Sequence, residues 1–85
     1  MKRFRTTRSF EKDFKKFGLS VELIDVLHHL LNGTPMPERY RDHPLINDFK
    51  GCRDCHVKPD LVLIYQVDAE VVTLMRLNSH SEIFG

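Results

Sequence analysis

The chain has 85 residues, 41% of them hydrophobic and 29% charged, and a formal net charge of +1 at pH 7. This length fits one small domain, predicted over residues 1–85, and the modest charge is unusual for a protein that binds free RNA. The basic start is followed by charged residues, so no secretory signal is expected, and no stretch approaches the roughly 18 apolar residues of a membrane span. The sequence therefore predicts a soluble, cytosolic protein whose two cysteines are reduced thiols.

The basic residues are concentrated at the N-terminus. Residues 1–17 hold seven Lys and Arg against two acids, whereas residues 18–85 hold six basic residues against ten acids. A basic first element suits contact with a polyanion on one face. A solvated helix face explains the same pattern equally well, so charge alone leaves both interpretations open.

The first half of the chain predicts two helices. Residues 2–6 suit a short edge strand, and a helix is expected over 7–17, where Phe10, Phe14 and Phe17 form one apolar stripe that we expect in the core. Gly18 ends this helix. Ser20 is a suitable N-cap for a second helix, which Asn32-Gly33 stops. The two helices are predicted to form a hairpin.

Two details of the second helix complete this prediction. Leu19 and Ile24 stand at the positions of a hydrophobic staple around the Ser20 cap. His28 and His29 lie about 100° apart around the helix, so both cannot face one ligand well. We interpret these two histidines as structural or surface residues.

The second half predicts a sheet. Pro35 and Pro37 break the helical pattern, and strands are expected over 52–58, 61–67 and 71–77. The strand 61–67 is apolar on both faces and should be central, and the short turn 68–70 suits an antiparallel hairpin. The predicted fold class is therefore α+β, with an N-terminal helical hairpin packed on one face of a small antiparallel sheet.

The segment Cys52-Arg53-Asp54-Cys55-His56 matches the C-x-x-C-H pattern of covalent haem attachment. The missing export signal argues against haem. Strand alternation over 53–58 also points Cys55 and His56 to opposite faces, a poor start for one metal site. Zinc would need two more ligands at suitable spacing. A thioredoxin-like redox motif is a further alternative, but we interpret both cysteines as small, partly buried strand residues and expect neither metal nor cofactor.

Titratable groups recur in loops and at strand ends of the second half: His43, His56, Asp60, Arg76 and His80. Histidine changes charge near neutral pH and can give and take protons, and a carboxylate can orient an imidazole. Arginine can hold a phosphate through two hydrogen bonds. Two proton carriers and an arginine suffice for metal-free RNA cleavage. From composition alone, structural hydrogen bonding explains these residues as well as an acid/base site does.

The order and spacing of these groups carry more information. Three segments resemble the YafQ branch of the RelE superfamily: Arg41-Asp42-His43-Pro44-Leu45, residues 51–60 with Arg53-Asp54-Cys55-His56 and Pro59-Asp60, and Ser79-His80-Ser81-Glu82-Ile83-Phe84. Those proteins are bacterial toxins of type II toxin–antitoxin systems. The resemblance covers nearly the whole chain, including residues 9–13, and implies a RelE-like fold.

The resemblance implies an endoribonuclease, an mRNA interferase that acts with the ribosome and is neutralised by a cognate antitoxin. Contact with operator DNA would come only through the antitoxin complex. By position, His43, His56, Asp60 and His80 match acid/base residues, and Arg76 matches the phosphate-stabilising arginine. Asp54 and Phe84 match substrate-binding positions near the RNA. His80 and His56 are our choice for the main proton carriers, with Asp60 orienting and tuning His56.

The chain departs from the family pattern in places. Relatives often carry an aromatic residue after the aspartate, which could stack on a base, whereas this chain has Leu61. The two cysteines replace other residues. Two alternatives stay beside the main hypothesis: a ribosome-independent ribonuclease on the same fold, and a non-catalytic member that only binds an antitoxin and DNA.

Overall fold

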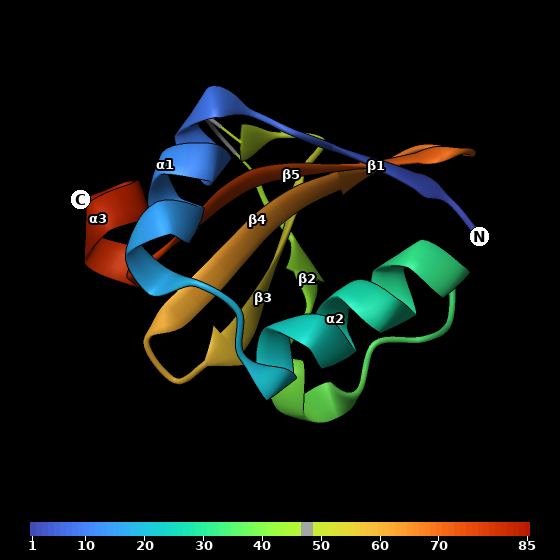
Figure 1. Cartoon of the computed structure of the whole chain (residues 1–85), viewed down its shortest axis with the longest axis horizontal. Coiled ribbons are helices and arrows are strands. Elements are labelled where there is room, and N and C mark those ends of the chain that lie inside the picture. Colours follow the sequence, from blue (N-terminus) through green and yellow to red (C-terminus); the bar gives the residue numbers. More distant parts are fainter. Residues whose placement is uncertain (47–48) are drawn as a thin grey trace.

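The computed structural model describes residues 1–46 and 49–85. Its elements follow one another as β1 (Arg3–Thr6), α1 (Arg8–Phe17), α2 (Val21–Asn32), the 3-10 turn η1 (Glu38–Tyr40), β2 (His43–Pro44), β3 (Arg53–Lys58), β4 (Leu61–Val67), β5 (Val71–Asn78) and α3 (His80–Phe84). Figure 1 shows them in chain order. Among the described residues, no helix is both long and apolar enough to cross a membrane.

The strands form one sheet in the order β1-β5-β4-β3-β2. The three predicted strands are antiparallel neighbours with β4 in the centre, and the α+β prediction is confirmed. The sheet is mixed, however, because the edge strand β1 runs parallel to β5. Asp68 closes the β4–β5 turn, where its carboxylate accepts hydrogen bonds from the N–H groups of Glu70 and Val71.

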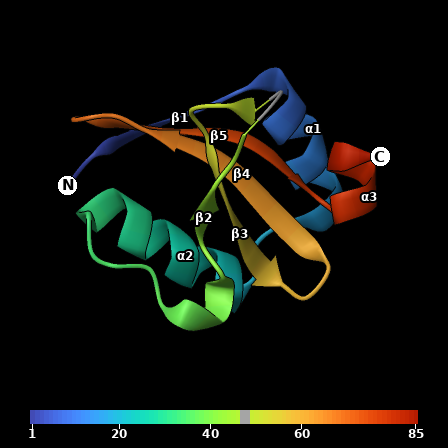
Figure 2. The ribbon, with the colours of Figure 1, turned by 180° about the vertical axis from the view of Figure 1, so that it is seen from behind.

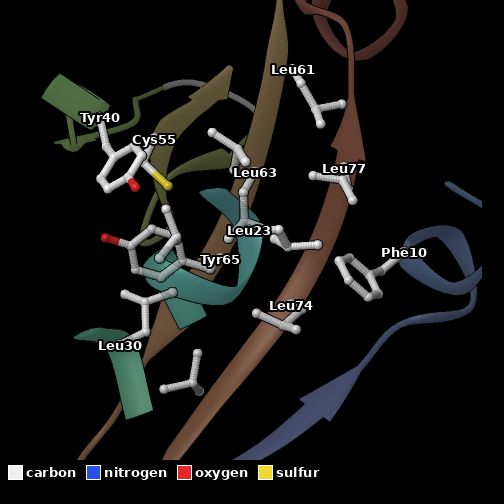
Figure 3. Packing of buried hydrophobic residues seen from close by; sticks show 13 residues of the cluster. Phe10, Leu23, Leu30, Tyr40, Cys55, Leu61, Leu63, Tyr65, Leu74 and Leu77 are labelled. Atoms are coloured by element: carbon white, nitrogen blue, oxygen red, sulfur yellow. The ribbon is translucent and has the colours of Figure 1, made fainter. Parts of the chain in front are cut away.

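Both long helices cover the same face of the sheet, as predicted. Phe10 of α1 and Leu23, Val26 and Leu30 of α2 join the buried residues of β3, β4 and β5 in the main core (Figure 3). The helices diverge from the connection between them instead of packing along each other (Figures 1 and 2). Phe17 lies at this diverging corner and is 39% exposed, so its expected place in the core is wrong.

The opposite face of the sheet has a smaller core. Cys52, Val62 and Ile64 are buried there, and Phe49 and Ile83 pack against them. Ile83 belongs to α3, which lies beside α1 at the end of the molecule away from the N-terminus in both views (Figures 1 and 2). This short helix covers only part of the face, which leaves room for a site.

Thr7 joins α1 to the exposed edge of β5. Strand β1 pairs with β5 only as far as Leu74, so the next carbonyl of that edge needs another donor. The Thr7 hydroxyl donates to the Met75 carbonyl at 2.7 Å and accepts from the Phe10 N–H at 3.0 Å. One side chain therefore caps the helix and extends the sheet edge. By contrast, the predicted cap Ser20 only accepts, from the Leu23 N–H.

Thr7→Ala should destabilise the protein more than Ser20→Ala. The first change removes a cap and a donor to a strand carbonyl, at a cost of about 2 kcal/mol, whereas the second removes a cap, at about 1 kcal/mol. Thr7→Ser keeps the hydroxyl and is the matched control. Urea unfolding measures all three, and equal losses for the two alanine variants would contradict the double role.

Candidate active site

The sheet register brings the predicted polar residues together. His43 of β2 pairs with Asp54 of β3, which lies opposite Ile64 of β4, and Ile64 lies opposite Arg76 of β5. Two residues further along β3, and so on the same face of the sheet, His56 lies opposite Val62, and Val62 opposite Asn78. Residues from four strands thus occupy two rows that are spaced two residues apart.

Asp54 is the buried centre of this arrangement. Its exposed fraction is only 3%, and its Oδ1 atom has no hydrogen-bond partner among the described residues. Burial raises the pKa of this carboxyl above its ordinary value, although the charges of His43, His56 and His80 act to lower it. All three predicted histidines therefore lie within electrostatic reach of one carboxylate.

The ring of His43 is held through its Nδ1 atom. That atom lies 2.8 Å from the Arg41 carbonyl oxygen, which accepts its proton, and 3.0 Å from Oδ1 of Asp54. The contact with Asp54 is a close approach without hydrogen-bond alignment, which is why Oδ1 has no partner among the described residues. With Nδ1 protonated, the neutral ring keeps its lone pair on Nε2, which is then able to accept a proton. Arg41 itself has a left-handed backbone, with φ of 50°.

A groove of about 490 Å³ lies over these residues. His43, Asp54 and His80 line it together with Phe49, Phe84 and other apolar side chains. Ser79 caps α3 by accepting from the Glu82 N–H, which places His80 as the first residue of the helix. The ring of Phe84 packs against those of His80 and Phe49, with centroids 4.7 and 5.6 Å away. The groove thus combines titratable groups with aromatic surface.

Arg76 forms an ion pair with Asp13 of α1. Its Nε donates to Oδ2 at 2.8 Å and its Nη2 to Oδ1 at 3.3 Å. Burial alone would raise the pKa of Asp13, but its hydrogen bonds with Arg76, the Leu77 N–H and the Asn78 amide outweigh this and hold the pKa below its ordinary value. The Arg76 guanidinium is therefore fixed by the first helix.

Asp60 lies apart from the buried carboxylate. It occupies the exposed turn between β3 and β4, and within residues 1–46 and 49–85 its side chain makes no hydrogen bond or ion pair. The expected contact with His56 is therefore not made in this structure. His56 also lines a second groove of about 490 Å³, to which Arg41 and Lys58 contribute positive charge.

Leu61 and the cysteines take structural places. Leu61 is 7% exposed and lies with Leu63 and Leu77 in the main core, so its side chain does not line the groove (Figure 3). Cys55 is buried in that same core, whereas Cys52 is buried on the other face of the sheet. The two cysteines form no disulfide, and they do not form a pair on one surface.

The sequence prediction missed two residues of this region, Asp13 and Phe49. Asp13 could have been found, because it lies three residues after Phe10 and one before Phe14. An acid on the apolar stripe of a helix is expected to be buried and to need a cationic partner. Phe49 stands in an irregular segment with no period, and we find no sequence signal for it.

Comparison with known proteins identifies the family. The profile of the bacterial YafQ toxins of type II toxin–antitoxin systems matches residues 2–85. The chain belongs to this YafQ toxin family. A Haemophilus influenzae protein that carries the YafQ name is 48% identical over 63 residues, and the mRNA interferase toxin YafQ of Escherichia coli K12 is 44% identical over 57. These alignments span 69% and 66% of this chain and 62% of each relative.

Solved structures give the same fold. YafQ from E. coli BL21(DE3) matches with a TM-score of 0.87 and 32% identity over all of both chains. A copper-bound mutant toxin from Helicobacter pylori matches with a TM-score of 0.92 and 38% identity, over 99% of this chain and 100% of that one. A metal-bound toxin from the same organism also matches, with a TM-score of 0.88 and 40% identity over 99% of this chain and 100% of that one. In this chain, no three His, Cys, Asp or Glu side chains of the described residues gather as a metal-binding group.

Asp54→Asn should stabilise the protein at pH 7, because burial raises the pKa of Asp54 and the charged form is costly in the folded state. The cost is absent at low pH, where this carboxyl is protonated in both states, and grows as the pH rises through the raised folded-state pKa. We expect a gain of about 1 kcal/mol, or about 4–8 °C in Tm, at pH 7 that shrinks toward pH 3.

Asp68→Asn is the matched control for Asp54→Asn. Hydrogen bonds from the N–H groups of Glu70 and Val71 lower the pKa of Asp68, so its replacement should decrease Tm at pH 7. Thermal unfolding followed by circular dichroism between pH 3 and pH 7 measures both variants. A lower Tm for Asp54→Asn at pH 7 would show that the charged carboxylate stabilises the fold.

Proposed function

We propose that this chain is an mRNA interferase, the toxin of a type II toxin–antitoxin system, which cleaves message on the ribosome. Family membership supports the toxin role. The observation that carries the chemistry is a buried carboxylate, Asp54, within electrostatic reach of His43, His56 and His80, two of which line a groove with an aromatic wall. Such a groove suits a nucleotide whose sugar and phosphate lie beside proton carriers.

In the proposed reaction a histidine takes the proton of an RNA 2′-hydroxyl, whose oxygen attacks the adjacent phosphorus. A second histidine gives a proton to the leaving 5′-oxygen as the P–O5′ bond breaks. The products are a 2′,3′-cyclic phosphate and a 5′-hydroxyl, and the step needs neither metal nor cofactor. His56 and His80 are the proposed proton carriers, and His43, with Nδ1 held by the Arg41 carbonyl, presents Nε2 as a further acceptor.

Arg76 is proposed to stabilise the negative charge that develops on the pentacovalent phosphorane. Asp13 occupies its Nε and one Nη2 position, and the other N–H groups have no partner among the described residues. These free donors are suited to two phosphate oxygens. Phe84 is proposed to stack on a base at the groove, with Phe49 behind it. Asp60, in its exposed turn, is proposed to meet the RNA near His56.

The proposed partners are the ribosome, which presents the message, and a cognate antitoxin. Solved complexes of E. coli DinJ with YafQ match this chain with TM-scores of 0.85 and 0.84 at 32% and 31% identity. By analogy, a small antitoxin binds this toxin in the cytoplasm, and operator DNA is contacted only through that complex. The net charge of +1 favours presentation by the ribosome over tight binding of free RNA.

Induced expression should arrest growth, and His80→Ala or His56→Ala should relieve the arrest. Loss of a general acid or base is expected to slow cleavage by about 10²–10⁴-fold. His28→Ala is the matched control, because His28 is exposed on α2, outside both grooves. Growth curves and primer extension on cleaved message measure the effect. Full toxicity of the His56→Ala/His80→Ala double variant would refute the assignment.

The cleaved message should end in a 2′,3′-cyclic phosphate, because the 2′-hydroxyl is the proposed nucleophile. Mass spectrometry of fragments from programmed ribosomes identifies this end, and a 3′-hydroxyl product would show different chemistry. The same RNA without ribosomes separates the main proposal from a ribosome-independent ribonuclease. Equal cleavage of naked RNA would favour the latter, and no cleavage in either case would favour a non-catalytic antitoxin-binding protein.

A further inference from the structure

Asp13 contacts three consecutive residues of the site segment although it belongs to α1. Its carboxylate accepts from Arg76 at 2.8 and 3.3 Å, from the Leu77 N–H at 2.9 Å and from the Asn78 side-chain amide at 3.0 Å. The residue is only 7% exposed. A buried carboxylate with this many donors has one stable orientation, and it imposes that orientation on its partners.

The contact with Arg76 uses one edge of the guanidinium. Arginine has five N–H donors in a planar fork. Asp13 engages the Nε–H and one N–H of Nη2, so three donors remain without a partner in the described part of the chain. The Arg76 side chain is 27% exposed, so the opposite edge of the fork is accessible. The plane of the guanidinium is therefore set by a carboxylate that itself cannot reach solvent freely.

The same carboxylate is connected to His80 through the backbone. Asn78, which donates to Asp13, accepts the Ser79 N–H on its Oδ1 atom at 2.8 Å. Ser79 is the N-cap of α3, and His80 is the first residue of that helix. Asp13 thus holds Arg76 directly and the start of the helix that carries His80 through one intermediate side chain.

We propose that Asp13 is a positioning residue of the cleavage reaction. It orients Arg76 toward the scissile phosphate and helps to hold His80 at a fixed position relative to Arg76. This inference rests on the proposed ribonuclease function. Asp13 does not meet the RNA, since its carboxylate is buried and fully engaged with protein donors. Its role is to fix the angle at which the arginine presents its free edge.

The pair also has an electrostatic consequence that separates positioning from simple stability. Asp13 is ionised, and its negative charge partly cancels the attraction of Arg76 for phosphate. Asp13→Asn removes this charge and the orientation together. RNA binding by the variant should therefore stay equal or become tighter, while the cleavage step slows. A merely structural role would instead weaken both in parallel with the folded fraction.

The test is single-turnover cleavage of a message on programmed ribosomes by the wild type, Asp13→Asn, Arg76→Ala and the double variant. Asp13→Asn should slow the cleavage step by about 10–100-fold, the size expected for a group misplaced by about 1 Å, with an unchanged or lower half-saturating concentration. The double variant should be slower than Arg76→Ala by a much smaller factor than Asp13→Asn loses alone, because Asp13 acts mainly through the arginine and only indirectly on His80. The Asp68→Asn variant, which replaces a carboxylate in the β4–β5 turn, should cleave like the wild type.

The outcomes separate this inference from the function on which it rests. Slow cleavage by Arg76→Ala with wild-type cleavage by Asp13→Asn would overturn the positioning role and leave the ribonuclease proposal standing. A further loss in the double variant equal to that of Asp13→Asn alone would also overturn it, since the two residues would then act independently. Wild-type cleavage by Arg76→Ala would remove the proposed role of Arg76, and with it this inference.

A measurement on the wild-type protein alone does not depend on how any variant folds. The Arg76 Nε–H, bonded to a buried carboxylate, should exchange slowly with solvent and give an observable side-chain resonance in ¹⁵N NMR spectra at pH 7. The exposed Arg3 provides the comparison. An Arg76 Nε–H that exchanges as fast as that of Arg3 would show that the clamp is not held in solution and would overturn the proposal.

Discussion

The burial of β4 on both faces is the constraint on which the rest of the molecule depends. Alternate residues of this strand point into two layers, so β3 and β5 must also present one set of side chains to each layer. The layer under α1 and α2 is closed as a core. On the opposite layer, α3 packs against the sheet together with Leu45 and Phe49 among the described residues, and the groove with His43, Asp54 and His80 lies beside them.

Two buried carboxylates, Asp13 and Asp54, show how burial yields opposite chemistry. Asp13 accepts hydrogen bonds from three residues, one of them a cation, so its pKa is lowered and it remains ionised. Burial raises the pKa of Asp54, and one of its oxygens has no hydrogen-bond partner in the described residues, so its charge is costly. The satisfied carboxylate supports structure. The unsatisfied carboxylate, Asp54, lowers the stability of the fold close to several histidines that can carry protons, which is typical of a functional site.

The sequence predicts those helices and strands that have a clear apolar spacing and their own capping residues. The boundaries of α1, α2 and β4 follow from apolar spacing, Ser20 and the glycines, and β4 is central as expected. The elements β2, η1 and α3 have two to five residues, too few for a period, and tertiary contacts stabilise them. Phe17 has the right spacing for the core, but the divergence of the helices, which spacing does not encode, exposes it.

For the site, residue types and family resemblance indicate which side chains matter, whereas their partners depend on strand register. The register places His43 opposite Asp54 and leaves Asp60 in the turn, so the carboxylate near the histidines is not the one that sequence order favours. Sequence order likewise gives no hint that Arg76 is held by a residue 63 positions earlier. Local spacing cannot contain this information, because it arises only when α1 packs against β5.

The Arg76–Asp13 pair also separates catalysis from binding in the proposed mechanism. A cation whose charge is partly cancelled by a buried carboxylate contributes little long-range attraction for a polyanion. Its main contribution is a hydrogen-bond direction that is fixed at short range. Affinity for RNA must then come from other groups, of which the exposed Lys12, Lys15 and Lys16 of α1 are candidates, or from the ribosome that presents the message. In the proposed mechanism, a net charge of only +1 gives weak attraction for free RNA, and cleavage depends on substrate that arrives already positioned.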